Sequence, residues 1–192
     1  MNIFLLHANA QICAEMHCDK HVIKMILEHC QLMYTAIHVL DPARLESVER
    51  INGLQAYKKT HVNHPCAKWA RASRKNFQWL LLLTVCLVRE KKYRWGGDHK
   101  CARHLQGLLW ASRVVPFPLE KMTPWAIANP YKHMEAIESY RHYYIHDKTR
   151  MLAWKHRPVP DFISVSSPGP FEPSMHVVQP PAPHRPSVGV LV

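Results

Sequence analysis

The stretch CAEMHCDKHVIKMILEHCQLMYTAIH, residues 13–38, predicts the element around which the chain folds. On a helical wheel its apolar side chains cover well over half of the circumference. The remaining sector is narrow and holds a seam of polar side chains, spaced alternately four and three residues apart: His17, His21, Lys24, Glu28, Gln31 and Thr35. A helix that is apolar on most sides lies at the centre of a domain. We therefore predict one long central helix from Cys13 to His38.

The polar seam has two interpretations. In the structural one, Lys24 and Glu28 form an ordinary i,i+4 ion pair and the histidines are satisfied core or surface residues. In the functional one, imidazole, amine and carboxylate line a cleft together, because unpaired charge is costly to bury. We favour the functional interpretation and take Glu28, His21, Lys24 and His17 as the candidate catalytic residues.

Length and charge limit the class of protein. The chain has 192 residues, of which 47% are hydrophobic, enough for one globular domain with a sufficient core. Twenty-five Lys and Arg against 14 Asp and Glu give a net charge of +11. Such a charge favours a polyanionic partner, and we expect double-stranded DNA, with acidic proteins or membrane surfaces as alternatives. The longest purely apolar run, residues 80–83, is too short to span a membrane.

The cysteines and the N-terminus indicate a compartment. The six cysteines include no C-x-x-C pair, and most have apolar neighbours. The first residues do not have the pattern of a secretory signal peptide. We expect free, buried thiols in a reducing intracellular compartment, which would be the host cytoplasm or nucleus if the protein is viral.

The remaining pattern predicts an all-α fold with a single helical domain, residues 1–163. A short apolar arm, residues 2–7, precedes the central helix, and three further helices are predicted: residues 65–93, 99–113 and 134–154. Residues 43–59 suggest a loop with a short helix, and residues 115–133 contain four prolines and stay irregular. Residues 164–192 are rich in proline and are predicted to form a disordered tail.

Basic and aromatic residues on the later helices are candidates for contact with nucleic acid. Arginine and lysine neutralise phosphates, while aromatic rings stack on bases. An alternative is that the aromatic residues fill the core. The candidates are Arg71, Arg74, Lys75, Arg141, Tyr140, Tyr144 and Trp125.

Two histidine groups have spacings that could suit a metal. His17 and His21 are four residues apart, as in helical zinc pairs, and His61, His64 and Cys66 form a looser cluster. Fifteen histidines produce such pairs readily by chance. We expect no metal and no other cofactor.

The segment DKHVIKMILE, residues 19–28, resembles the first-helix motif of pyrimidine-dimer DNA glycosylases of the endonuclease V type from phages and large DNA viruses. In that family Asp-x-His is followed by a catalytic Glu seven residues after the His, a spacing kept by His21 and Glu28. The longer string HCDKHVIKMILE, after an initial MNIF, more closely resembles a set of uncharacterised viral proteins.

The glycosylase resemblance implies a metal-free reaction. In the family the N-terminal α-amine attacks the sugar C1′ and forms an imine, and the Glu carboxylate assists ring opening and β-elimination. Basic residues hold a kinked duplex. Carried over, Glu28 is the catalytic carboxylate and His21 its polar neighbour.

Three departures bear on the chemistry. Residue 2 is Asn, which is unsuited to removal of the initiator Met, and the chain before His21 is longer than in the family. The family's arginines near its Glu are absent, so Lys24 becomes an alternative imine-forming amine. The leading expectation is a glycosylase/AP lyase for damaged or modified pyrimidines. The alternatives are a non-catalytic nucleic-acid-binding viral protein and a nucleotide-processing enzyme that uses the same seam.

Overall fold

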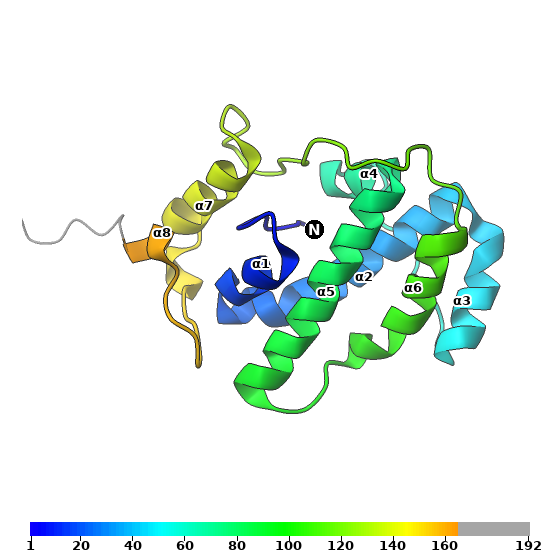
Figure 1. The fold of residues 1–192 in the computed structure, drawn as a ribbon, viewed down its shortest axis with the longest axis horizontal. Coiled ribbons are helices and arrows are strands. Elements are labelled where there is room, and N and C mark those ends of the chain that lie inside the picture. The colour runs from blue at the N-terminus through cyan, green and yellow to red at the C-terminus, as the bar shows by residue number, and fades with distance from the viewer. Residues whose placement is uncertain (165–192) are drawn as a thin grey trace, which may run out of the picture.

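The computed structural model describes residues 1–164, which contain eight α-helices and no strand, and this confirms the all-α prediction (Figure 1). The helices are α1 Ala10–Met16, α2 Asp19–Leu40, α3 Leu45–Asn52, α4 Pro65–Ala72, α5 Arg74–Trp95, α6 Leu105–Val114, α7 Ala136–Asp147 and α8 Asp161–Ser164. Three 3-10 turns lie between them: η1 Pro42–Arg44, η2 Lys100–His104 and η3 Thr149–Met151.

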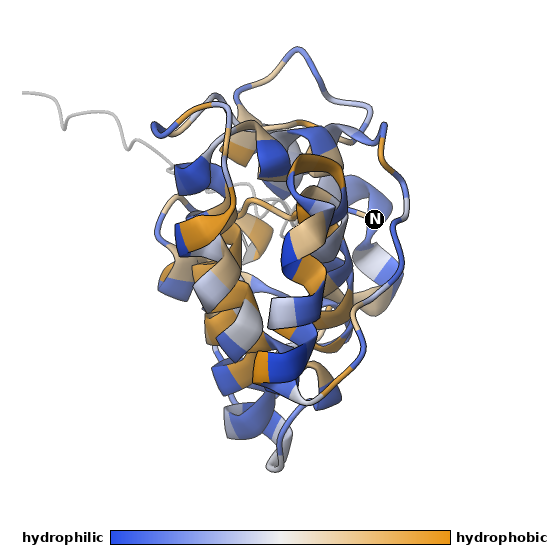
Figure 2. Cartoon of the chain, turned by 90° about the vertical axis from the view of Figure 1, so that its right-hand side faces the viewer, coloured by the Kyte–Doolittle hydropathy of each residue, from blue (hydrophilic) through white to orange (hydrophobic). Residues whose placement is uncertain are grey.

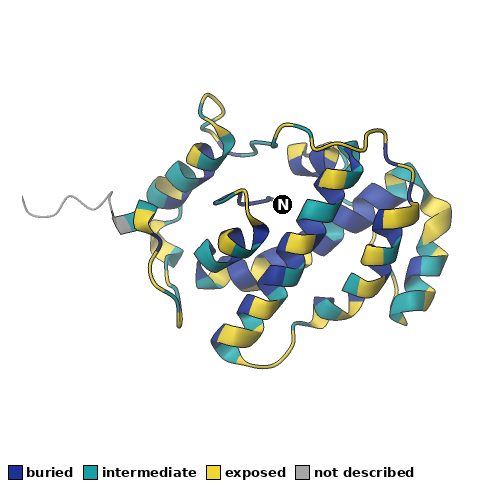
Figure 3. Ribbon diagram, in the orientation of Figure 1, coloured by how far each residue is buried: buried dark blue, intermediate teal, exposed yellow. Residues whose placement is uncertain are grey.

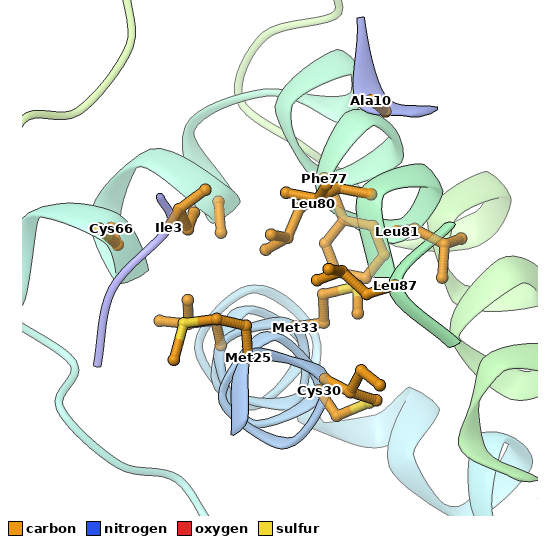
Figure 4. Close-up of a cluster of buried hydrophobic side chains, with 14 of the residues drawn as sticks. Ile3, Ala10, Met25, Cys30, Met33, Cys66, Phe77, Leu80, Leu81 and Leu87 are labelled. Atoms are coloured by element: carbon orange, nitrogen blue, oxygen red, sulfur yellow. The ribbon is translucent and has the colours of Figure 1, made fainter. Parts of the chain in front are cut away.

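Helix α2 is the central element, as its apolar pattern predicts. It packs against α4 and α5, and α5 in turn packs against α1 and α6. Side chains from these helices and from the N-terminal arm meet in one cluster, in which Ile3 and Cys66 face Met25 and Leu80 (Figure 4). Most of α2 and the inner face of α5 are buried, whereas the outward-facing residues of both helices are exposed (Figure 3). Hydropathy follows the same division, with apolar and polar bands alternating along the helices (Figure 2).

The N-terminal arm is part of the core. Ile3, Phe4, Leu5 and Leu6 are each at most 4% exposed, and the arm runs without helical structure through the middle of the molecule (Figure 1). It lies beside α7, as shown by the hydrogen bond from Tyr140 to Asn2. A charged amino terminus therefore comes close to the central helix.

The prediction of one helix from Cys13 to His38 is wrong, because the chain is extended at His17 and Cys18. Groups far away in the sequence stabilise this break by satisfying the carbonyls that a continuous helix would have used itself. The Trp154 indole donates to Met16 O over 2.9 Å, and Arg94 donates to His17 O over 2.9 Å. Helix α1 starts where the Asn9 side chain accepts two main-chain N–H bonds.

The second predicted helix, residues 65–93, is also two helices. Ser73 is extended, caps α5 by accepting from Asn76 N, and forms a bridge with Leu119. The predicted helix at residues 99–113 begins instead as η2, whose N-cap residue is His99. The helix predicted at residues 134–154 is shorter in the structure: it is α7, which ends at Asp147. The short helix expected within residues 43–59 is α3.

The predicted proline-rich tail, apart from Ser164, lies outside the described residues, and the domain boundary at residue 163 stays a prediction. Within residues 1–164 no helix is both long enough and apolar enough to cross a membrane. All six cysteines fall in this part of the chain, where they are buried and free.

Candidate active site at Glu28

The carboxylate of Glu28 lies where the N-terminal arm crosses α2. Its Oε2 atom accepts the main-chain N–H of Asn2 over 2.9 Å and lies 3.8 Å from the amino group of Met1. Its Oε1 atom lies 3.4 Å from the Lys24 ammonium. The Glu28 side chain is 14% exposed, whereas Lys24 is 68% exposed. Two amines of different kinds therefore meet one half-buried carboxylate.

The Asn2 side chain fixes the arm at this position. Its Oδ1 atom accepts the Tyr140 hydroxyl over 2.9 Å and lies 3.6 Å from the Cys66 thiol. The Tyr140 hydroxyl also accepts the N–H of Ala128, which ties the loop before α7 to the arm. The Met1 side chain is only 5% exposed. Helices α4 and α7 thus hold the amino terminus against Glu28.

A pocket of about 600 Å³ opens on one side of Glu28. Its α2 wall carries Lys24, Glu28 and Gln31 together with two exposed apolar residues, Ile23 and Leu27. The facing wall comes from residue 57, from the last turns of α5 and from the segment after α5, and contains Tyr57, Lys91, Asp98, His99, Lys100 and Cys101. An apolar floor with polar groups at its edge suits a small organic ligand such as a nucleotide.

A second pocket, of about 430 Å³, is lined by His64, Pro65, Ala128, Asn129, Pro130 and Lys132. It lies close to the amine and carboxylate, because Ala128 O accepts from the Asn2 side chain over 3.5 Å. Burial and the positive charge of the amino terminus lower the pKa of His64, while the Glu28 charge acts in the opposite direction. The two pockets therefore flank the site.

His17 and His21 do not join Glu28. His21 is 4% exposed, stacks on Phe4 at 4.0 Å between ring centroids, and lies 2.5 Å from the Tyr144 hydroxyl. His17 is fully buried and bonds Cys13 O through Nδ1. Burial lowers the pKa of His17 to about 4, and burial together with nearby positive charges lowers that of His21 to about 3. Both are neutral groups of the core at neutral pH.

The side chains predicted to contact phosphate differ in whether other groups of the protein already bind them. Arg74 pairs with Glu120 and also donates to the carbonyls of Ser112 and Val115. Arg71 donates to Val62 O over 2.8 Å and so holds the loop before α4. Lys75 is exposed. Their contact with nucleic acid stays a prediction.

The aromatic candidates lie mostly inside the protein. Tyr140 and Tyr144 are fully buried, so stacking on a base would require the surrounding residues to move. Trp125 is partly exposed and packs against Trp69, with ring centroids 5.1 Å apart. Arg141 donates to Leu6 O over 2.9 Å and helps to hold the arm.

Sequence reasoning selected Glu28 and Lys24 correctly as neighbours but missed other residues at the site. Asn2 and Asn129 have no distinctive spacing, and their positions depend on long-range contacts. His64 falls in a candidate metal cluster of the sequence and, before Pro65, near the predicted start of a helix, and neither feature places it beside the amino terminus. Within residues 1–164 no group of three or more His, Cys, Asp or Glu is placed to hold a metal ion.

Comparison of the chain with protein-family models, with curated proteins and with solved structures found no match.

Proposed function

We propose that the protein is a DNA glycosylase/AP lyase that acts on damaged or modified pyrimidines through an amine and the Glu28 carboxylate. The observation that carries the proposal is the 3.8 Å approach of the Met1 amino group to Glu28 Oε2. Imine chemistry needs an amine beside a group that can take and return its protons. The net charge of +11 favours a polyanionic substrate.

The proposed reaction proceeds in three steps. The unprotonated amine attacks C1′ as the bond from C1′ to the base breaks, the base departs with the electron pair of that bond, and Glu28 takes the proton that the amine loses. Glu28 returns this proton to the ring oxygen O4′, which leaves C1′ and generates a protonated imine. Glu28 then removes a proton from C2′, and the 3′ phosphate departs with its electron pair, which cuts the strand.

Two amines compete for the role of nucleophile. The Met1 amino group lies nearest to Oε2 of Glu28, whereas the Lys24 ammonium lies nearest to Oε1. The buried Met1 side chain limits the movement of the first amine, whereas Lys24 is largely exposed. We favour the Met1 amine because an oriented nucleophile reacts faster than a mobile one.

Borohydride trapping tests the proposal. Folded protein is incubated with abasic-site and thymine-dimer duplexes in the presence of borohydride, which reduces an imine to a stable covalent adduct. We expect an adduct for the wild type, its loss in Glu28→Gln, and its retention in Lys24→Ala. Peptide mapping identifies the amine. Absence of both adduct and nicking on either duplex would reject the lyase.

An added Gly–Ser dipeptide before Met1 separates the two amines further. The extension turns the Met1 amine into an amide and moves the free amine away from Glu28. We expect no adduct from this variant if Met1 is the nucleophile, and an unchanged yield if Lys24 is. Circular dichroism checks that the extended protein remains folded.

The pocket of about 600 Å³ beside Glu28 favours a second candidate, an enzyme that processes free nucleotides. Thermal stabilisation by mononucleotides without DNA binding would support it. Salt-dependent DNA binding that Glu28→Gln leaves unchanged would instead support a non-catalytic DNA-binding protein.

A further inference from the structure

The pocket between α4 and the loop before α7 contains hydrogen-bond donors and no acidic side chain. Its lining residues are those named above, from His64 to Lys132, and they include no Asp or Glu. Lys132 is exposed at the edge and no ion pair holds its ammonium within residues 1–164. The pocket adjoins the Glu28 site through the contact between Asn2 and Ala128.

Asn129 is the unusual residue of this pocket. It is only 6% exposed, and its Oδ1 atom accepts both the N–H of Tyr131 over 2.8 Å and the hydroxyl of Ser139 over 2.9 Å. A main-chain N–H can only donate, so this bond settles which end of the amide is oxygen. The Nδ2 group is therefore a buried donor, and it has no partner in the described part of the chain. Leaving such a donor unsatisfied costs free energy unless a ligand or a water molecule completes it.

His64 adds a donor to this pocket, and α4 adds partial positive charge. The Nδ1 atom of His64 accepts the N–H of Cys66 over 3.2 Å, so in the neutral imidazole the proton is on Nε2. Helix α4 begins at Pro65, on the wall of this pocket, and the N-terminus of a helix carries partial positive charge. The residues that carry an ammonium, an imidazole N–H and an unpartnered amide therefore line one space, at the N-terminus of α4.

We propose that this pocket binds a phosphate group of a DNA strand, adjacent to the nucleotide that reacts at Glu28. The oxygens of a phosphodiester accept hydrogen bonds only, and they match the donors of Lys132, His64 and Asn129. A small shift of the loop would bring the buried Asn129 amide into contact with the phosphate, and the exposed Lys132 ammonium would pair with its charge. The position along the strand rests on the proposed function, whereas phosphate binding itself requires no catalysis.

Equilibrium binding to duplexes with a tetrahydrofuran abasic analogue tests this site without any reaction. In a set of duplexes, single linkages near the analogue are replaced one at a time by uncharged methylphosphonate. We expect one of these linkages to weaken wild-type binding about tenfold, as for loss of a charged hydrogen bond. The same linkage should have little effect in Asn129→Asp, which keeps the two acceptor bonds but replaces the donor by a carboxylate.

Lys132→Gln provides a second variant whose exposed position leaves folding undisturbed. It should reduce the effect of that linkage, and Lys121→Gln, an exposed control with the same change in charge, should not. A thermal-shift titration with inorganic phosphate, in wild type and Asn129→Asp, tests for a free anion as the ligand. Stabilisation by phosphate without any sensitive linkage would overturn the DNA strand as the source.

The outcomes separate this proposal from the proposed function. If one neutral linkage weakens binding of the wild type but of neither variant, and no adduct or nicking is seen, the phosphate site stands and the lyase is rejected. If the protein nicks DNA but no linkage has an effect that depends on Asn129 and Lys132, the lyase stands and the phosphate site is rejected. If neither DNA nor inorganic phosphate responds to these variants, the pocket is not a phosphate site.

Discussion

The main-chain N–H of Asn2 donates to Glu28 Oε2 over 2.9 Å across 26 residues of sequence. This bond joins the first extended residues of the chain to the middle of its central helix. The same carboxylate also lies near the Met1 amino group and the Lys24 ammonium. It therefore links the stability of the arm to the chemistry proposed for the site.

Glu28→Ala should destabilise the protein by about 1.5–3 kcal/mol, because it leaves the Asn2 N–H and the Met1 amine without their charged acceptor. Glu28→Gln keeps one acceptor oxygen and should cost less. Urea denaturation measures both free energies of unfolding. As a control, exposed Glu46 in α3 should tolerate Ala within about 1 kcal/mol. Equal losses at both positions would show that Glu28 does not hold the arm.

Arg94→Met should be among the most destabilising substitutions, at about 3–5 kcal/mol. The Arg94 guanidinium is 1% exposed and makes four hydrogen bonds, to Glu15 O, His17 O, Asp19 Oδ1 and Glu90 Oε2. Removing it leaves two buried carbonyls unsatisfied at the break between α1 and α2. Chemical denaturation should show the loss, whereas Arg113→Met on the exposed side of α6 should stay close to wild type.

Stability should fall as the pH is lowered from about 6.5 to 4. Burial lowers the pKa of His17 to about 4 and that of His29 to about 3, and His21 also has a pKa of about 3. Below pH 6.5 these histidines bind protons in the unfolded chain but not in the folded protein. The free energy of unfolding therefore falls by up to about 1.4 kcal/mol per pH unit for each histidine.

Urea unfolding at pH 7, 6 and 5 measures this dependence. His29→Gln should reduce the slope by about one proton, and the exposed control His133→Gln should leave it unchanged. A slope that is the same in both variants would mean that buried histidines do not set the acid sensitivity.

Gly107→Ala should destabilise the protein although Ala normally stabilises a helix interior by roughly 0.5–1 kcal/mol. A Cβ at Gly107 would lie 2.6 Å from Asn52 Nδ2. Asn52 accepts the N–H of Gly107 over 2.7 Å and donates to the Tyr34 hydroxyl over 3.0 Å, so it cannot turn away without losing both bonds. We expect a net loss of about 1–2 kcal/mol, measured by thermal unfolding. A gain in stability would show that Asn52 moves freely.

The sequence predicted the central helix because its apolar pattern is dense and local. It did not predict the breaks, because these depend on distant partners. Arg94 and Trp154 donate to carbonyls at the end of α1, and Leu119 O accepts the N–H of Arg74 after Ser73. Hydrophobic periodicity carries no information about such contacts.

The candidate site divides in the same way. Lys24 and Glu28 are neighbours on one helix face, so their meeting follows from spacing alone. The amino terminus reaches Glu28 only because Tyr140 and Cys66 hold Asn2. The unpartnered amide of Asn129 likewise depends on the loop and α7, and no local pattern announces it.

The arm that runs through the core has a consequence for biosynthesis. Its residues leave the ribosome before Tyr140, which holds Asn2 and follows 138 residues later. Helix α7 can therefore hold the arm only once translation has reached it. A chain that stops short of α7 lacks the clamp on Asn2, so the arrangement at Glu28 is completed only after nearly all of the domain has been synthesised.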